Sequence, residues 1–234
     1  MIRLRFEKAE QVFETDYTVI LPMAEIPAYL SGADGMNRPV PWVELPAMIW
    51  PGAEKSVAEK LKELRAMGVE HAVAENIGAA QLALDCGFVL HGGFTLNVLN
   101  SEAAALYASL GFADLTASFE MAVSDYKGQK PAVPMGLTVY GYLPLMKFRN
   151  CPAKGEKGCG ACSGRSVLTD RMNKKFTVIC RRKQYSELLN CVPLYLGDRE
   201  LPASDFQLLY LYLQIFRLTS LSDSMQDLSV LHFL

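Results

Sequence analysis

Strands and helices alternate through the middle of this 234-residue chain, and that order constrains the fold more than any other feature. The clearest helix is predicted at 53–67, where Val57, Leu61 and Leu64 form an apolar stripe. The other expected elements are strands at 2–6, 17–22, 43–50, 70–76, 88–94, 113–120 and 135–143, and helices at 77–86 and 101–110. Alternation with short turns predicts parallel strands joined by right-handed crossovers. About five such units are visible, too few to close an eight-stranded barrel, so we expect an α/β fold of TIM-barrel type with a partial or open barrel.

The C-terminal stretch FQLLYLYLQIF, residues 206–216, is almost entirely apolar. It is too short to span a membrane, for which about 20 residues are needed. We expect it to form a buried strand or helix.

Four of the six cysteines lie in one short stretch, residues 147–183. They are Cys151, Cys159, Cys162 and Cys180, with the spacing C-x7-C-x2-C-x17-C. Two cysteines separated by two residues can turn both sulfurs toward one point, and two more from flanking segments would complete a tetrahedral set. Such a set suits zinc or an iron–sulfur cluster, and the spacing favours neither.

The same stretch carries eleven Lys and Arg residues against two acids, while the rest of the chain has 12 basic and 23 acidic residues. A basic region on an acidic body is typical of proteins that bind a polyanion such as RNA. A solvated loop, or compensation for thiolate charge, would explain the same pattern. The sequence therefore leaves RNA or another polyanion as an expected partner, without any inference about base specificity.

The N-terminus, MIRLRFEKAE, lacks the apolar core of a secretory signal, and no stretch is apolar enough for a membrane span. We therefore expect a cytoplasmic protein without membrane attachment, in which clustered cysteines bind metal rather than form disulfides. We expect three regions: barrel-type strands and helices at 1–146, the basic cysteine module inserted at 147–183, and a barrel remainder at 184–234.

Several blocks of this sequence resemble the peptidase U32 family of collagenase-like proteins. They are HGGFTLNVLNSEAAALYASLGFADLTASFEM (91–121), VYGYLPLMKFRNCP (139–152), CGAC (159–162), LTDRMNKKFTVIC (168–180) and ELLNCVPLYLGDRE (187–200). The blocks occur in the family's order and are most similar to the C-terminal barrel segment of long bacterial U32 proteins. The tail after about residue 210 does not match the family.

This resemblance implies a TIM-barrel-like fold and a cluster, expected to be 4Fe-4S, on the four cysteines; zinc is the alternative cofactor. It also implies one of two activities: oxygen-independent hydroxylation of RNA or of ubiquinone precursors, or endopeptidase activity on collagen-like chains. A third possibility is a non-catalytic barrel half that needs the missing upstream U32 segment as its partner.

Polar residues at or just after the predicted strands are the candidate catalytic groups, because ligands of parallel α/β folds bind at the carboxyl ends of the strands. His91 could act as a general base, and its alternative is a structural hydrogen bond. Glu120 could orient substrate or remove a proton, or it could form a salt bridge. Asn97 is the third candidate, and it could instead only cap a turn.

Protease motifs are missing from the chain: it contains neither HExxH nor GxSxG. The peptidase activity that the resemblance implies is therefore unsupported by a recognisable nucleophile or metal-water motif.

Overall fold

The computed structural model describes residues 1–32, 38–126, 129–152, 154, 159–160, 162–182, 184–196 and 208–213. The chain divides into two compact units. Unit 1 comprises Met1–Val139 and Leu196–Leu234, and unit 2 comprises Tyr140–Tyr195. Unit 2 contains the whole of the cysteine-rich stretch.

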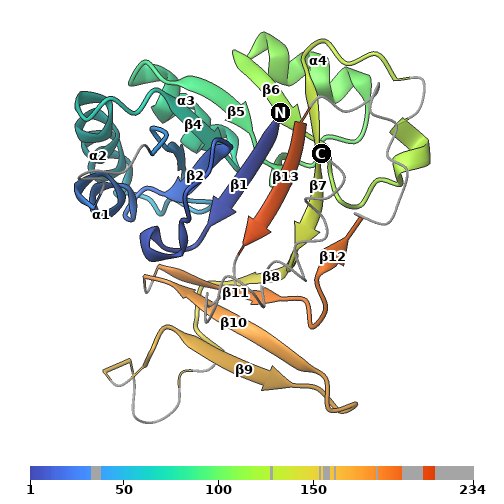
Figure 1. The fold of residues 1–234 in the computed structure, drawn as a ribbon. Coiled ribbons are helices and arrows are strands. Elements are labelled where there is room, and N and C mark those ends of the chain that lie inside the picture. The colour runs from blue at the N-terminus through green and yellow to red at the C-terminus, as the bar shows by residue number, and fades with distance from the viewer. Residues whose placement is uncertain are drawn as a thin grey trace. The chain divides into compact units, whose positions relative to one another are not determined.

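Unit 1 is built on a curled parallel sheet of eight strands (Figure 1). The strands are β1 (Ile2–Phe6), β2 (Thr18–Pro22), β3 (Trp42–Glu44), β4 (His71–Ala74), β5 (Val89–Gly92), β6 (Phe112–Thr116), β7 (Met135–Gly141) and β13 (Leu208–Leu213). They pair in the order β7-β13-β1-β2-β3-β4-β5-β6, and β6 pairs with β7 as well. The expected α/β architecture with parallel strands is thus present, and all eight strands belong to this chain.

Helices connect most of these strands and lie outside the curl (Figure 1). They are α1 (Ile26–Ser31), α2 (Glu54–Ala66), α3 (Ile77–Asp85) and α4 (Ser101–Ser109), with short 3-10 turns η1 (Ala9–Gln11), η2 (Phe94–Leu96) and η3 (Val123–Tyr126). Leu61 and Leu64 of α2 are buried, as the predicted apolar stripe requires. Asn76 and Asn100 begin α3 and α4, because each side-chain oxygen accepts a hydrogen bond from the backbone three residues on.

The apolar tail contributes a strand rather than a helix. Leu208–Leu213 forms β13, which runs parallel to β1 with Ile2 opposite Leu209 and Phe6 opposite Leu213. Residues 214–234, which include most of the tail that does not match the U32 family, lie outside the described residues.

Unit 2 contains a four-stranded antiparallel sheet in the order β8-β11-β10-β9. Its strands are β8 (Pro144–Phe148), β9 (Arg165–Thr169), β10 (Lys175–Arg181) and β11 (Tyr185–Leu189), and a two-residue strand, β12 (Leu194–Tyr195), pairs with the end of β7. The turn between β9 and β10 is tight because Asp170 accepts hydrogen bonds from the backbone N–H groups of Met172 and Lys174, each at 2.8 Å.

No helix in the described ranges is long and apolar enough to cross a membrane.

Candidate functional site

A line of buried polar side chains crosses the inside of the curled sheet. Both terminal nitrogens of Arg3 on β1 donate to the carboxylate of Asp114 on β6, at 2.8 and 2.6 Å. The second Asp114 oxygen also meets Nδ1 of His91 on β5, at 2.7 Å. Nε2 of His91 lies 2.9 Å from Nδ1 of His71 on β4. Since β1 and β6 are not neighbours in the sheet, the Arg3–Asp114 pair must span the space that the sheet encloses.

The alternation of β1 explains why arginines lie inside. Both faces of a parallel sheet of this kind are covered, so alternate positions face either the helices or the enclosed space. Leu4 and Phe6 are each 1% exposed. Arg3 and Arg5, which alternate with them along β1, are also buried, at 1% and 3% exposed. A buried guanidinium must be paired with acids, and carboxylates on β6 and β3 supply that pairing.

An aromatic ring packs against the two histidines. Trp42, the first residue of β3, stacks on His91 with ring centroids 3.8 Å apart and on His71 at 4.6 Å. The guanidinium carbon of Arg3 lies 4.2 Å from the Trp42 ring, a cation–π contact. Indole, imidazoles and guanidinium thus form one compact cluster, which fixes the orientation of the imidazole rings.

Burial and hydrogen bonding set the protonation states in this cluster. Burial would raise the pKa of Asp114, but hydrogen bonds from Arg3 and His91 outweigh it and hold that pKa below its usual value. Burial lowers the pKa of His91, and Asp114 only partly opposes this effect. Burial also lowers the pKa of His71, against the opposing charge of Glu70. At neutral pH Asp114 is therefore ionised and both imidazoles are neutral.

A second buried ion cluster lies toward the carboxyl ends of β1 and β3. Arg5 donates from Nε and a terminal nitrogen to the two carboxylate oxygens of Glu44, at 2.9 and 2.6 Å, and also bonds to Glu7. Burial alone would lower the pKa of Arg5, but Glu44 and Glu7 raise it well above the usual value. Arg5 is therefore a permanent cation that ties β1 to β3.

Glu75, directly after β4, is held by the loop that follows β5. Its carboxylate accepts hydrogen bonds from the Thr95 hydroxyl and, at 3.1 Å, from the Thr95 backbone N–H. The carboxylate occupies the space that a side chain at Gly93 would fill. A glycine is therefore needed at this position so that the Glu75 carboxylate can reach Thr95.

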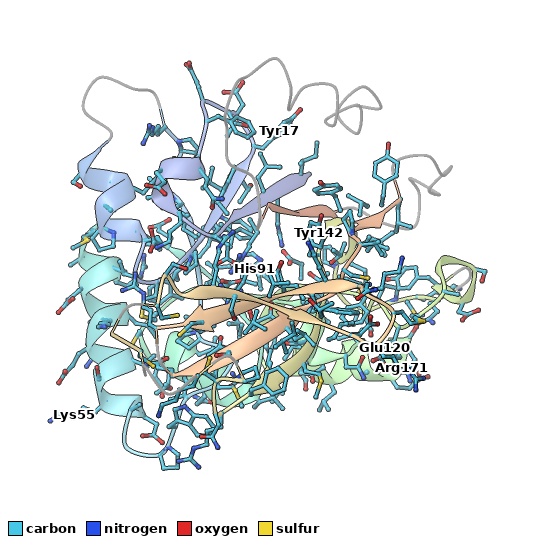
Figure 2. The ribbon with its side chains drawn as sticks, turned by 90° about the horizontal axis from the view of Figure 1, so that it is seen from below. Tyr17, Lys55, His91, Glu120, Tyr142 and Arg171 are labelled. Atoms are coloured by element: carbon cyan, nitrogen blue, oxygen red, sulfur yellow. The ribbon has the colours of Figure 1, made fainter. Side chains whose placement is uncertain are left out.

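The three predicted catalytic residues occupy different surroundings. His91 is 4% exposed and lies within β5, with both ring nitrogens engaged by Asp114 and His71. Asn97 adopts a left-handed conformation and accepts a hydrogen bond from the Ser118 hydroxyl at 2.6 Å. Glu120 is exposed in the segment after β6, and its backbone N–H donates to the same Ser118 hydroxyl. Figure 2 shows His91 among the strands and Glu120 well away from it. Asn97 and Glu120 are linked through Ser118, whereas His91 belongs to the separate buried line.

The strand directions in unit 2 bring the four predicted ligands to one end of its sheet. Cys151 follows the end of β8, and Cys180 lies next to the end of β10. Cys159 and Cys162 precede the start of β9. Because adjacent strands are antiparallel, the end of β8, the start of β9 and the end of β10 all lie at the same end of the sheet.

Gly164 links two of these cysteines. Its backbone N–H donates to Sγ of Cys162 at 3.3 Å, and its carbonyl accepts from the backbone N–H of Cys180 at 2.8 Å. Its φ of +80° is a conformation that favours glycine. The Cys159 carbonyl also accepts a bond from the Cys162 N–H at 3.4 Å, which closes the short loop between them.

Cysteine thiolates are suitable metal ligands, and the backbone positions of the four cysteines lie at one end of the sheet. Their sulfur atoms, however, do not surround a common point. None of the six cysteines forms a disulfide in the structure. Across the described parts of the chain, no three His, Cys, Asp or Glu side chains are placed so that they could hold one metal ion. The expected metal module is thus not shown, and its ligands remain a prediction.

Exposed basic side chains surround the cysteine end of the sheet. Arg149, Lys154, Arg165 and Arg182 are all exposed and lie in segments at this end. The opposite end, at the turn between β9 and β10, carries Asp170 together with the exposed Arg171, Lys174 and Lys175. The local charge at the cysteine end of the sheet is therefore positive.

Sequence reasoning missed most of the buried line, namely Arg3, His71, Asp114 and Trp42. Arg3 could have been found from the sequence, because β1 contains two arginines. A parallel strand covered on both faces has no side in contact with solvent, so these arginines must be buried and paired with acids. The pairing of Asp114 with His91 carries no comparable local signal, because it depends on the register of β5 against β6, which includes an irregularity between Leu90 and His91.

One solved structure that resembles this chain in its backbone trace is described as the structure of the U32 peptidase Mk0906. It shares 14% sequence identity with this chain at a TM-score of 0.48, over 90% of this chain and 91% of that one. The predicted resemblance to the U32 family thus has a counterpart among solved structures, at low identity, and the likeness assigns no activity to this chain. No protein-family model and no curated protein matches the sequence.

Proposed function

We propose that this protein is a U32-type iron–sulfur enzyme that modifies RNA by oxygen-independent hydroxylation. The observation that carries the proposal is the convergence of Cys151, Cys159, Cys162 and Cys180 at one end of a small sheet, surrounded by exposed arginines and lysines. Four thiolates are the usual ligands of an iron–sulfur cluster, and basic side chains compensate their charge.

The four cysteines would hold the cluster, which supplies one-electron chemistry when bound. The N–H···S hydrogen bond from Gly164 to Cys162 is of the kind that stabilises a thiolate, because a thiolate accepts hydrogen bonds better than a thiol does. Arg149, Lys154, Arg165 and Arg182 would bind RNA phosphates through charge-assisted hydrogen bonds.

In unit 1, the three predicted catalytic residues would act at the carboxyl ends of the strands. Glu120 is exposed and could contact a substrate directly. Asn97, locked by Ser118, would fix the loop on which substrate is positioned. His91 has no ring nitrogen turned to solvent, so its contribution would pass through His71, which is less buried.

The test is a comparison of cellular RNA from an anaerobically grown host with and without this chain, analysed as nucleosides by mass spectrometry. The proposal expects a nucleoside heavier by one oxygen atom that appears only with the chain and disappears with Cys162→Ser. Cys86→Ser, outside the cysteine module, is the matched control and should leave the product intact.

A collagenase-like endopeptidase is the competing activity, and the same purified proteins separate the two. Gelatin cleavage that survives Cys162→Ser, together with no modified nucleoside, would refute the hydroxylase proposal. RNA binding that weakens steeply with salt would support it, since phosphate contacts release counterions.

A further inference from the structure

The positions of the protons along the buried line follow from its geometry. Asp114 receives two hydrogen bonds from Arg3 and is ionised, so Nδ1 of His91 must carry the proton that it donates to Asp114. Nε2 of the neutral His91 ring is then an acceptor. The proton between the two rings therefore sits on Nδ1 of His71, and Nε2 of His71 is left as the acceptor at the outer end of the line.

The line can take up one more proton without breaking. An added proton on Nε2 of His71 leaves every bond in place. The extra proton can instead reside on Nε2 of His91. His71 is then neutral with its single proton on Nε2, and its bare Nδ1 accepts the hydrogen bond from His91. A second added proton leaves an N–H on both rings along the 2.9 Å line that joins them, and no hydrogen bond can then form.

We propose that His71 and His91 form an acid-sensitive latch inside the curled sheet, closed while at most one extra proton is bound and opened by the second. Opening separates His71 of β4 from His91 of β5, whereas Nδ1 of His91 still donates to Asp114 of β6. The Trp42 ring, in contact with both imidazoles, loses its packing against them at the same step.

The charges facing the latch come from four surrounding elements and the turn before β4. Arg3 and Asp114 lie on β1 and β6, and Arg65 of α2 and Glu70 in that turn act on His71. The Arg5–Glu44 pair of β1 and β3 lies in the same enclosed space. Asp114 and Glu70 favour protonated imidazole, whereas Arg3, Arg65 and burial oppose it, and burial is the largest effect on both rings. The folded state therefore binds protons less readily than the unfolded chain does.

The weaker proton binding of the folded state determines how stability changes with pH. The pKa values of both histidines are lowered by folding, so the unfolded state takes up protons first as the pH falls below about 6.5. The unfolding equilibrium constant should then rise, by at most tenfold per pH unit for each proton that the unfolded state binds in excess. The rise stops once the pH is below the folded-state pKa values.

The first test is nitrogen-15 NMR of the intact chain at neutral pH. The latch requires both imidazoles to be protonated on Nδ1, which is the less common neutral form. Resonances that assign the proton of either ring to Nε2 at neutral pH would overturn the proposal, since the line of donors would then be different.

The second test measures urea unfolding between pH 7.5 and about 5, a window around the unfolded histidine pKa. His71→Asn retains an N–H donor for His91 but cannot titrate, so the pH slope should fall from at most two protons to at most one. His91→Phe keeps an aromatic ring against Trp42. The pH slope of this variant should be no larger than the part that His71 contributes, at most one proton. The third histidine, His232, lies outside the described residues, so every variant retains it and only differences in slope between variants are compared.

A pH slope that is the same in the parent chain and in His71→Asn would rule out the latch. Should His91→Phe fail to fold, hydrogen exchange of the parent chain decides: amides of β4 and β5 should lose protection on acidification before those of α2. Simultaneous loss of protection throughout unit 1 would contradict a local latch.

Discussion

At the scale of single residues, Asp114 connects Arg3 of β1 to His91 of β5. It accepts two hydrogen bonds from Arg3 and one from His91, and its carboxylate is the only acid in the line. Truncating one partner of a buried ion pair is costly, because the remaining charge is left without compensation in a low-dielectric interior.

Asp114→Asn should therefore destabilise the chain by about 3–5 kcal/mol, as found for other buried pairs that lose one partner. The measurement is urea unfolding at neutral pH. Because the pKa of Asp114 is lowered by folding, the stabilisation that it provides is present above the unfolded value of about 3.9 and is lost as the pH falls through the folded value. A matched control is Asp125→Asn on η3, which is exposed and should change the free energy of unfolding by less than about 0.5 kcal/mol. Equal effects of the two changes would contradict the importance of the buried line.

Gly93 should not tolerate alanine while Glu75 is present. The added methyl group would overlap the Glu75 carboxylate and displace it from Thr95, at a cost of about 1–3 kcal/mol. Removing the acid as well, in Glu75→Ala with Gly93→Ala, should recover part of that loss. The double-mutant cycle is the readout, and additive effects of the two changes would show that the residues do not compete for the same space.

At the scale of elements, the two helix-capping asparagines offer a matched comparison. Asn100 makes one capping bond, to the Ala103 N–H, at 2.8 Å. Asn76 makes the equivalent bond to Ala79 at 2.7 Å and also donates to the carbonyls of Pro46 and Ala47. The extra bonds tie the start of α3 to the segment that follows β3.

Asn76→Ala should thus cost more than Asn100→Ala. Loss of a cap alone is worth about 1 kcal/mol, and each additional net hydrogen bond adds about 1 kcal/mol. Thermal unfolding of the two variants gives the comparison directly. A larger loss for Asn100→Ala would show that the Pro46 and Ala47 contacts contribute nothing.

Much of the element order could be predicted from the sequence, because the signals were local. The helices predicted at 53–67, 77–86 and 101–110 correspond closely to α2, α3 and α4. The predicted strand at 43–50 is reduced to Trp42–Glu44, since Pro46 cannot donate to a ladder. Helix α1 was not predicted, because its six residues, IPAYLS, are too short to show helical periodicity.

At the scale of the whole molecule, what the sequence could not supply was long-range pairing. The partnership of β13 with β1 joins residues about 200 positions apart, and no local pattern specifies it. The antiparallel sheet of unit 2 likewise depends on a distant pairing, that of β8 with β11, in which Phe148 lies opposite Ser186. The cysteine spacing suggested the ligand set, and the U32 resemblance suggested an iron–sulfur cluster for it. The strand directions of unit 2 explain how residues with such unequal spacing reach one end of a sheet.

The most direct measurement of the central claim is the visible spectrum of anaerobically purified protein, with iron and sulfide content, for the parent chain and all six single Cys→Ser variants. We expect a brown protein with absorption near ~400 nm that is lost or strongly reduced in the variants of Cys151, Cys159, Cys162 and Cys180. The Cys86 and Cys191 variants should keep the full spectrum. A colourless zinc-containing parent protein, or a spectrum that survives the loss of Cys162 and of Cys180, would contradict the account.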